Sequence, residues 1–201
     1  MEHSVKLPPD DYHTTVIPLW TFANHPNKEA IYEANRHYDV DYEWWNTNYD
    51  YFIEQMAEKG VDVEGKDIAF SGFCSQGDGA CFDADVNLDV FLADNKFRHL
   101  RKVKDHIFVS IKKNSYAFHY SHEKTRYVDC YIDGPATGAT ARLDALVEKL
   151  AETIESERYS LSCEIYRDLE DSFDSMISDE AVKETLVEND YEFYKDGKQA
   201  N

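Results

Sequence analysis

The sequence predicts an α+β protein in which several helices pack on a mainly antiparallel sheet. Apolar residues recur at helical spacing in long stretches towards both ends of the chain, which is typical of helices with one buried face. Shorter runs in the middle alternate apolar and polar residues, as strands with one buried face do. Short turns join such runs, so we expect antiparallel hairpins.

The length and composition favour one domain, residues 1–201. Apolar side chains make up 42% of the residues, which is enough to bury a core and argues against a disordered chain. Residues 1–26 should form an extended N-terminal strap, because Pro8 and Pro9 prevent a helix there. Residues 140–187 should form a long helical region after a break rich in glycine and proline.

The sequence predicts neither a membrane span nor a signal peptide. No run of about 18 apolar residues occurs, and the first residues lack a basic region followed by an apolar one. The four cysteines include no CxxC pair, which favours free thiols in a reducing compartment over a zinc site. We therefore expect a cytoplasmic protein without a cofactor or a bound metal.

Individual helices and strands follow from local patterns, with Gly60 ending one helix and Ser178 capping another. The predicted helices are residues 27–38, 41–59, 95–114 and 178–187, and one or two helices between 143 and 176. Within that last stretch, Ser156–Ser160 is either a bend or part of one continuous helix. The predicted strands are residues 14–20, 61–73, 82–90, 115–123, 125–133 and 191–194.

The run Phe82–Val90 alternates apolar and polar residues without a break. Its acids begin as a calcium-binding loop does, with the spacing D-x-D-x-N-x-D from Asp83. Leu88, however, stands where such a loop needs glycine. We therefore interpret the run as a strand with one acidic face.

Charge is distributed unevenly along the chain. The net charge is −19, yet residues 96–126 hold nine Lys or Arg and two acids, so the rest of the chain carries −26. An acidic surface keeps a protein soluble and repels nucleic acid, and rows of carboxylates can stand in for phosphates before a basic protein groove. The basic segment either binds an anion or nucleic acid, or pairs with the protein's own acids.

The stretch between Phe70 and Phe82 is the best candidate for a site. Three glycines, two serines, a glutamine, an aspartate and two cysteines crowd into it, whereas one or two turn residues would be enough to join two strands. Backbone N–H groups next to glycines can cradle a phosphate, and a nearby imidazole can act as acid or base. The candidate ligand-binding residues are Ser71, Ser75, Gln76, Gly77, Asp78, Gly79, His119 and His122.

Several roles for this loop stay open. Cys74 is a candidate nucleophile if a histidine activates it. His119 and His122 could begin a metal site together with Asp78. The plainest alternative is a tight hairpin whose side chains hydrogen-bond its own backbone. No catalytic residue can be assigned, because none of these spacings is diagnostic. The dinucleotide and P-loop fingerprints are also absent.

Three strings, Phe70–Phe82, His119–His122 and Asn189–Gly197, are similar to those of a family of small tailed-phage proteins. The first string carries the pattern F-S-G-F-x-S-Q-G-D-G-A-x-F. Some members of that family are described as antitoxins of toxin–antitoxin systems. The resemblance implies a phage origin and an accessory role in the host cell, and it implies no reaction.

We therefore expect a phage-type accessory protein that binds and neutralises a host toxin, defence protein or nucleic-acid-binding protein. The acids of residues 83–89 and of the helices after residue 140 would select a partner with a basic surface. We expect no membrane contact and no direct binding to nucleic acid. The alternative is a protein or enzyme that binds a nucleotide or another small phosphorylated ligand through Ser71–Phe82 with His119 and His122.

Overall fold

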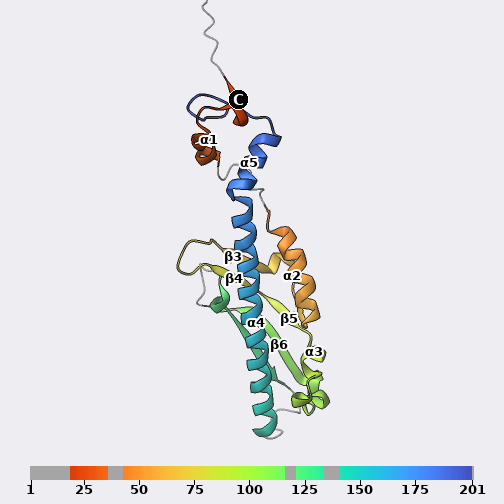
Figure 1. The fold of residues 1–201 in the computed structure, drawn as a ribbon. Coiled ribbons are helices and arrows are strands. Elements are labelled where there is room, and N and C mark those ends of the chain that lie inside the picture. The colour runs from red at the N-terminus through yellow and green to blue at the C-terminus, as the bar shows by residue number, and fades with distance from the viewer. Residues whose placement is uncertain (1–18, 36–42, 116–120, 134–140, 201) are drawn as a thin grey trace, which may run out of the picture. The chain divides into compact units, whose positions relative to one another are not determined.

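The computed structural model describes residues 19–35, 43–115, 121–133 and 141–200 (Figure 1). It confirms the predicted class, because it combines helices with antiparallel sheets. The chain divides into two compact units. Residues 41–175 make up the larger unit, and the smaller unit combines residues 1–40 with residues 176–201.

Four antiparallel strands form the main sheet of the larger unit, in the order β2–β5–β6–β7. The strands are β2 (Val61–Asp62), β5 (Ala84–Val86), β6 (Ile107–Lys113) and β7 (Arg126–Ile132). Asp62 lies opposite Asp85, Asp85 lies opposite Ser110, and Ser110 lies opposite Asp129. This register places four polar side chains in one row on one face of the sheet.

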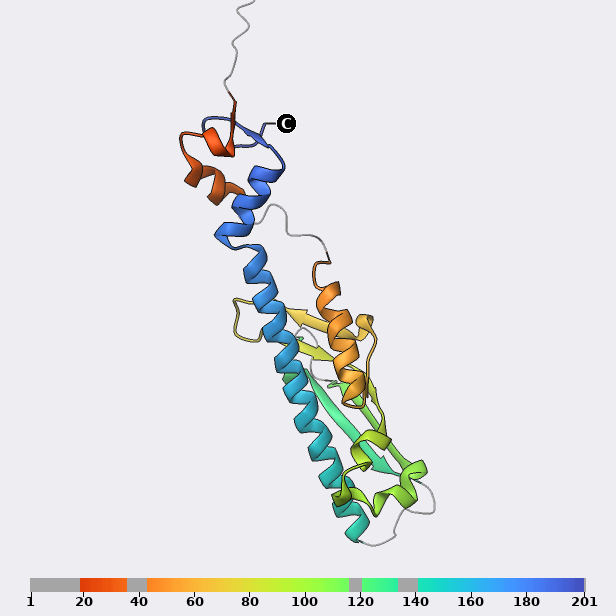
Figure 2. The ribbon, with the colours of Figure 1, turned by 45° about the vertical axis from the view of Figure 1, so that its right-hand side comes forward.

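Helices of the larger unit pack on the other face of this sheet (Figures 1 and 2). They are α2 (Asn46–Glu58), α3 (Leu88–Leu92) and α4 (Ala141–Met176). Val61 and Ile111 of the sheet are buried in one cluster with Leu161 of α4, and Ile107 is buried in a second cluster with Leu150. Burial of these apolar side chains is the main force that holds helices and sheet together.

The predicted helical region after residue 140 contains one continuous helix, because α4 runs through Ser156–Ser160 without a bend. Arg158 is 2% exposed and donates to both carboxylate oxygens of Glu155, at 3.0 and 2.6 Å. It also donates to the backbone oxygen of Glu123 at 2.6 Å, and Glu155 accepts from the backbone N–H of Val128 at 3.2 Å. This network ties α4 to the edge strand β7 and satisfies a buried charge.

A separate hairpin consists of β3 (Ile68–Ser71) and β4 (Gly79–Phe82). Ile68 pairs with Phe82 at its base, and Ser71 pairs with Gly79 next to the loop of residues 72–78. Ile68 and Phe82 are buried in the same cluster as the apolar residues of α2. The hairpin is therefore anchored in the core of the larger unit, and its loop extends from that anchor.

The smaller unit has a core of its own. Its main elements are β1 (Trp20–Thr21), α1 (Lys28–Asn35), α5 (Asp179–Glu188) and β8 (Glu192–Phe193). Phe193 pairs with Trp20 across the two strands and is buried together with Ile31. Ser178 caps α5 as predicted, because its hydroxyl accepts from the N–H of Ala181 at 3.3 Å.

The predicted helix over residues 95–114 is wrong. Two short 3₁₀ helices replace its first half, and strand β6 replaces its second half. The 3₁₀ helices are η3 (Asn95–Phe97) and η4 (Leu100–His106). From Ile107 onward, pairing with β5 and β7 decides the conformation, and the β-branched Ile107, Val109 and Ile111 suit a sheet better than a helix.

The predicted strand Phe82–Val90 is shorter than expected. The strand β5 ends at Val86, and α3 begins two residues later. Asn87 explains this end, because its side-chain oxygen accepts from the N–H of Asp89 at 3.1 Å and so caps α3. Asn87 is thus the N-cap of α3 and not a strand residue. The acidic face of the strand is limited to the residues before Asn87.

Several other boundaries differ from those predicted. Gly60, with a φ of +80°, ends α2 as expected, whereas α2 itself begins only at Asn46. The predicted strand over residues 61–73 is divided into β2 and β3 by a 3₁₀ turn, η2 (Gly65–Asp67). Most of the predicted strap, residues 1–26, and of the predicted strands 14–20 and 115–123 lies outside the described residues.

Candidate functional site

The loop of the β3–β4 hairpin is held together by Asp78. One oxygen of its carboxylate accepts from the backbone N–H groups of Cys74 at 2.8 Å and Ser75 at 2.5 Å. The N–H of Asp78 donates in turn to the backbone oxygen of Ser75 at 3.1 Å, and Gly77 has a φ of +115°. These contacts favour the alternative in which side chains of the loop satisfy its own backbone.

His122 packs against the loop end of this hairpin, at Gly79. A Cβ placed on Gly79 would lie 2.5 Å from the Cβ of His122, so only glycine fits there. Ser71 donates to the backbone oxygen of Ser121 at 3.4 Å. The His122 ring accepts from the N–H of Lys124 at 3.2 Å and lies 3.9 Å from a carboxylate oxygen of Glu123.

The predicted site residues therefore separate into groups. Ser71, Gly79 and His122 lie together where the strands meet the loop, and Asp78 faces the loop backbone. The remaining loop residues, Ser75, Gln76 and Gly77, lie at the tip, where Ser75 and Gln76 are exposed. His119 lies outside the described residues.

A cavity of about 400 Å³ with aromatic walls opens beside the loop. Its lining consists of Trp44, Phe70, Gly72, Phe73, Cys74, Ser75, Asp78 and Phe173. The ring centroids of Trp44 and Phe173 lie 5.9 Å apart, and those of Phe73 and Phe173 lie 5.2 Å apart. Trp44 can be noticed in the sequence, because it lies outside the apolar stripe of the helix predicted over residues 41–59. No local sequence pattern links Phe173 to the loop.

Burial raises the pKa of two groups of the larger unit, the phenol of Tyr166 beside the aromatic cavity and the thiol of Cys130 on β7. Burial, followed by the nearby charges of Glu170 and Asp78, raises the pKa of Tyr166, which packs on Phe73 beside the aromatic cavity. Burial and the neighbouring Asp129 raise the pKa of Cys130 to about 11, so this thiol is a poor nucleophile at neutral pH.

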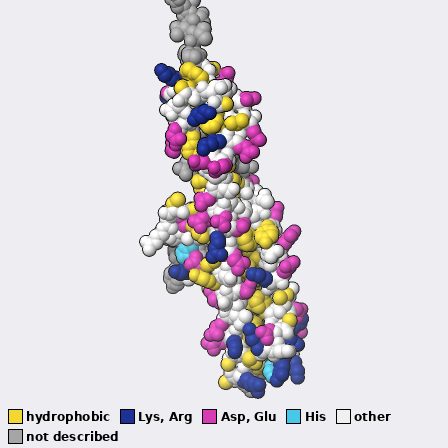
Figure 3. Space-filling view, in the orientation of Figure 1, with side chains coloured by type: hydrophobic (Ala, Val, Ile, Leu, Met, Phe, Trp, Pro, Cys, Tyr) yellow, Lys and Arg dark blue, Asp and Glu magenta, His cyan; other side chains and the backbone are white. Residues whose placement is uncertain are grey.

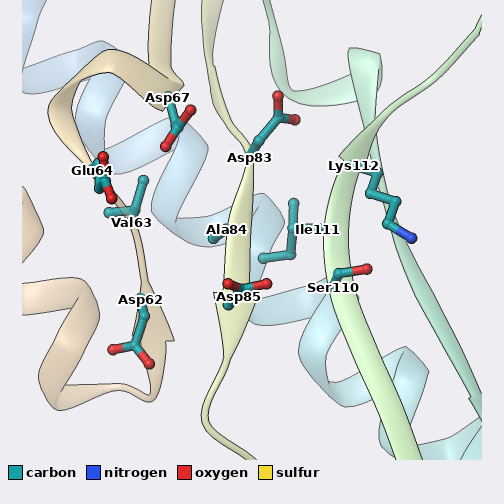
Figure 4. A pocket seen from close by; sticks show the side chains of 10 residues that line it. All are labelled: Asp62, Val63, Glu64, Asp67, Asp83, Ala84, Asp85, Ser110, Ile111 and Lys112. Atoms are coloured by element: carbon teal, nitrogen blue, oxygen red, sulfur yellow. The ribbon is translucent and has the colours of Figure 1, made fainter.

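A second feature lies on the face of the main sheet opposite α4, which we call the outer face. A hollow of about 400 Å³ is open there, and Figure 4 shows the side chains around it. Its lining consists of Asp62, Val63, Glu64, Asp67, Asp83, Ala84, Asp85, Ser110, Ile111 and Lys112. Five carboxylates and one ammonium group thus surround this acidic hollow.

Two of these carboxylates have cationic partners. Asp83 lies 2.6 Å from the guanidinium of Arg126, which is 8% exposed, and Glu64 lies 2.5 Å from the ammonium of Lys66. The Asp83 pair is part of the structure, since removing Asp83 would leave the buried guanidinium of Arg126 without a counter-charge. The Glu64 pair is largely exposed to solvent and contributes little.

Asp62 and Asp85 face each other across β2 and β5, and neither makes an ion pair with any described residue. The one ammonium group of the lining, that of Lys112, lies 2.9 Å from Asp129, whose hydrogen bond and charge raise the pKa of Lys112. Like charges directly opposite on a sheet are destabilising, by an amount of order 0.5 kcal/mol. The free protein therefore carries an electrostatic cost at this position.

Aromatic rings extend the outer face beyond the acidic hollow. Phe108 and Tyr131 lie opposite each other in the register, with stacked rings 5.5 Å apart, and are 48% and 50% exposed. Tyr127, 44% exposed, lies opposite Lys112 on the same face. Among the described residues no helix covers these rings, and the sequence patterns did not single them out.

Neither a membrane-crossing helix nor a metal-binding cluster occurs among the described residues. None of their helices is both long and apolar enough to cross a bilayer. They contain no group of three or more His, Cys, Asp or Glu side chains placed to hold a metal ion.

These features define an α+β protein whose helices pack on one face of an antiparallel sheet and whose other face presents carboxylates and aromatic rings. The chain belongs to the family described as a domain of unknown function (DUF8835), which matches residues 44–179, more than half of the chain. That span holds the main sheet, the hairpin and all of α4. No curated protein and no solved structure matches the chain.

Proposed function

We propose that this protein is a phage-type accessory protein that binds a basic surface of a host protein through the outer face of its sheet and thereby neutralises that partner. The partner class is a toxin, a defence protein or a nucleic-acid-binding protein, each of which can present a basic groove. The observation that carries the proposal is the opposed pair Asp62 and Asp85 at the acidic hollow.

Electrostatics supports a basic partner. A cation placed between Asp62 and Asp85 would remove the repulsion between these carboxylates in the free protein. The free energy that this repulsion costs the folded chain would then favour binding. The net charge of −19 would in addition speed the encounter with a positively charged protein. Both effects weaken with salt, because exposed charges are screened.

The exposed rings support a protein partner rather than a small cation. Tyrosine is enriched among the residues that dominate binding energies, and ring stacking preorganises such residues. Phe108 and Tyr131 are already stacked and half exposed in the free chain. They lie beside the charged row, which gives the outer face an apolar anchor next to a charge that selects the partner.

The test compares two double variants of the full chain. Asp62→Asn with Asp85→Asn removes two charges from the acidic hollow, and Asp171→Asn with Asp174→Asn removes two exposed charges from α4. Each immobilised protein is incubated with bacterial lysate, and captured proteins are identified by mass spectrometry and then purified for affinity measurement. We expect to capture a basic protein that binds the wild type and the Asp171→Asn, Asp174→Asn variant with equal affinity. Its affinity for the Asp62→Asn, Asp85→Asn variant should be lower by at least about tenfold. Equal binding by all three, or capture of no basic protein, would contradict the proposal.

The second candidate function is binding of a small ligand by the hairpin loop, and the aromatic cavity beside that loop is the observation that favours it. Asp78→Ala should lower stability, because two backbone N–H groups lose their acceptor. Gln76→Ala should leave stability unchanged, because Gln76 is exposed. If Gln76→Ala abolishes an activity or a ligand-induced stabilisation while the protein stays folded, the loop is a ligand site. If only Asp78→Ala has an effect, and that effect is unfolding, the loop is a structural hairpin.

A further inference from the structure

One end of the larger unit is basic although the chain as a whole is strongly acidic. A cavity of about 450 Å³ opens there between η3 and the first turns of α4. Its lining consists of Asn95, Lys96, Arg98, His99, Arg142, Ala145, Leu146 and Lys149. Four cationic side chains and an imidazole thus surround this basic cavity, and no carboxylate does. Figure 3 shows Lys and Arg side chains gathered at the lower end of the larger unit, where α4 begins.

The arrangement follows from the local structure. Arg142 and Lys149 are seven residues apart, which is close to two turns of α4, so both lie on the same side of that helix. Lys96 and Arg98 come from η3 and the residue that ends it, on the other side of the cavity. Cationic side chains that are far apart in the sequence therefore line the same cavity.

Three of these four cations form no ion pair with a described residue. Lys96 lies 3.2 Å from Asp94, but within the part of the chain that the structure describes Arg98, Arg142 and Lys149 form no ion pair. Some lysines elsewhere are paired, as Lys104 is with Asp89 at 2.6 Å. A chain with 40 acids and 21 bases has carboxylates to spare, so the lack of acids around this cavity sets it apart from the rest of the surface.

We propose that the basic cavity binds a small molecule carrying clustered phosphates, such as a nucleoside diphosphate or triphosphate. Each guanidinium group can donate two parallel hydrogen bonds to phosphate oxygens, and a lysine ammonium adds a compact positive charge. Arg98, Arg142 and Lys149 together therefore match a di- or triphosphate. The volume lies within the usual range for small-molecule sites, about 300–1,000 Å³.

The charge of the whole chain favours a small anion over nucleic acid. A long polyanion would extend past the basic cavity and meet the acidic surface that gives the chain its net charge of −19. A ligand that fits inside the cavity interacts mainly with the nearest cations, because more distant charges are screened over about 8–10 Å at moderate salt. This proposal is independent of the acidic hollow and of any protein partner.

Calorimetric titration of the full chain with inorganic tripolyphosphate tests the proposal. The wild type should bind, and affinity should fall as salt rises. Arg142→Ala with Lys149→Ala should weaken binding about 30-fold, because two charge-assisted contacts are lost. Both side chains are exposed on a helix, where alanine is well tolerated, so the variant should stay folded. Arg98→Ala, outside α4, provides a second variant with the same expected direction.

The matched control removes two cations elsewhere. Arg167→Ala with Lys195→Ala changes the net charge equally at exposed positions outside the basic cavity, and its affinity should equal that of the wild type. No binding by the wild type, or equal weakening in both double variants, would overturn the proposal. A single-stranded oligonucleotide forms the third arm. If it binds more tightly than tripolyphosphate and loses affinity in the cavity variant, the surface is a nucleic-acid contact, and the small-ligand proposal is wrong.

Discussion

The two faces of the main sheet differ in whether their charged side chains have partners. On the face that packs against α4, Arg158 is buried and fully paired with Glu155 and with a backbone oxygen. On the outer face, Asp62 and Asp85 are exposed and oppose each other. The first arrangement stabilises the fold, whereas the second costs stability and gains nothing within the chain.

This difference separates charges that build the structure from charges that are available to a partner. A buried ion must be paired, or the fold loses several kcal/mol. An exposed carboxylate is hydrated, so a chain can keep two of them opposite each other at a small cost. An arrangement that costs stability on an otherwise open surface is evidence for a task outside the fold.

Removing the partner of the buried charge should have the largest effect. Glu155→Ala leaves the guanidinium of Arg158 without a counter-charge and the N–H of Val128 without an acceptor. We expect the free energy of unfolding to fall by about 3–5 kcal/mol. Urea unfolding followed by circular dichroism measures the change.

Glu152→Ala is the matched control, because Glu152 is an exposed residue of the same helix and makes no described ion pair. Its effect should lie within about 0.5 kcal/mol of zero. If both variants lose the same stability, the buried network does not hold α4 to β7.

Adjacent residues of β6 sharpen the comparison between the faces. Ile111 is 1% exposed and packs in the core cluster that contains Leu161 of α4, whereas its neighbour Ser110 lies opposite Asp85 on the outer face. Ile111→Ala should lower the free energy of unfolding by about 3 kcal/mol, because it leaves a cavity in the core. Ser110→Ala should change it by less than about 0.5 kcal/mol. Similar losses in the same urea experiment would show that the outer face is packed rather than open.

The sequence predicts those parts of the fold that local signals determine. Helix α4 shows a stripe of apolar residues, and Ser178 and Gly60 mark helix ends through the cap and the positive φ that they allow. The stretch 95–114 shows the limit of such signals. Its apolar spacing fits a helix, but the neighbouring strands β5 and β7 supply hydrogen bonds that make Ile107–Lys113 a strand.

The candidate sites divide in the same way. The hairpin loop is visible in the sequence, since its glycines and polar residues are contiguous. Only part of the acidic hollow can be predicted from the sequence. Asp83 and Asp85 stand out in an alternating run, but Asp62 comes close to Asp85 only because β2 pairs with β5. The basic cavity depends on Lys149 of α4, far along the chain from the basic segment over residues 96–126.

The smallest expected effect is also the most direct test of the opposed pair. Asp62→Asn keeps the shape of the side chain and removes its repulsion with Asp85, so the free protein should become more stable by about 0.5 kcal/mol. The gain should shrink when salt is added, because screening already weakens the repulsion. Asp171→Asn removes an equal charge from an exposed position on α4 and should leave the urea midpoint almost unchanged. A loss of stability in Asp62→Asn would mean that the pair supports the fold, and the outer face would then need no partner to explain its charges.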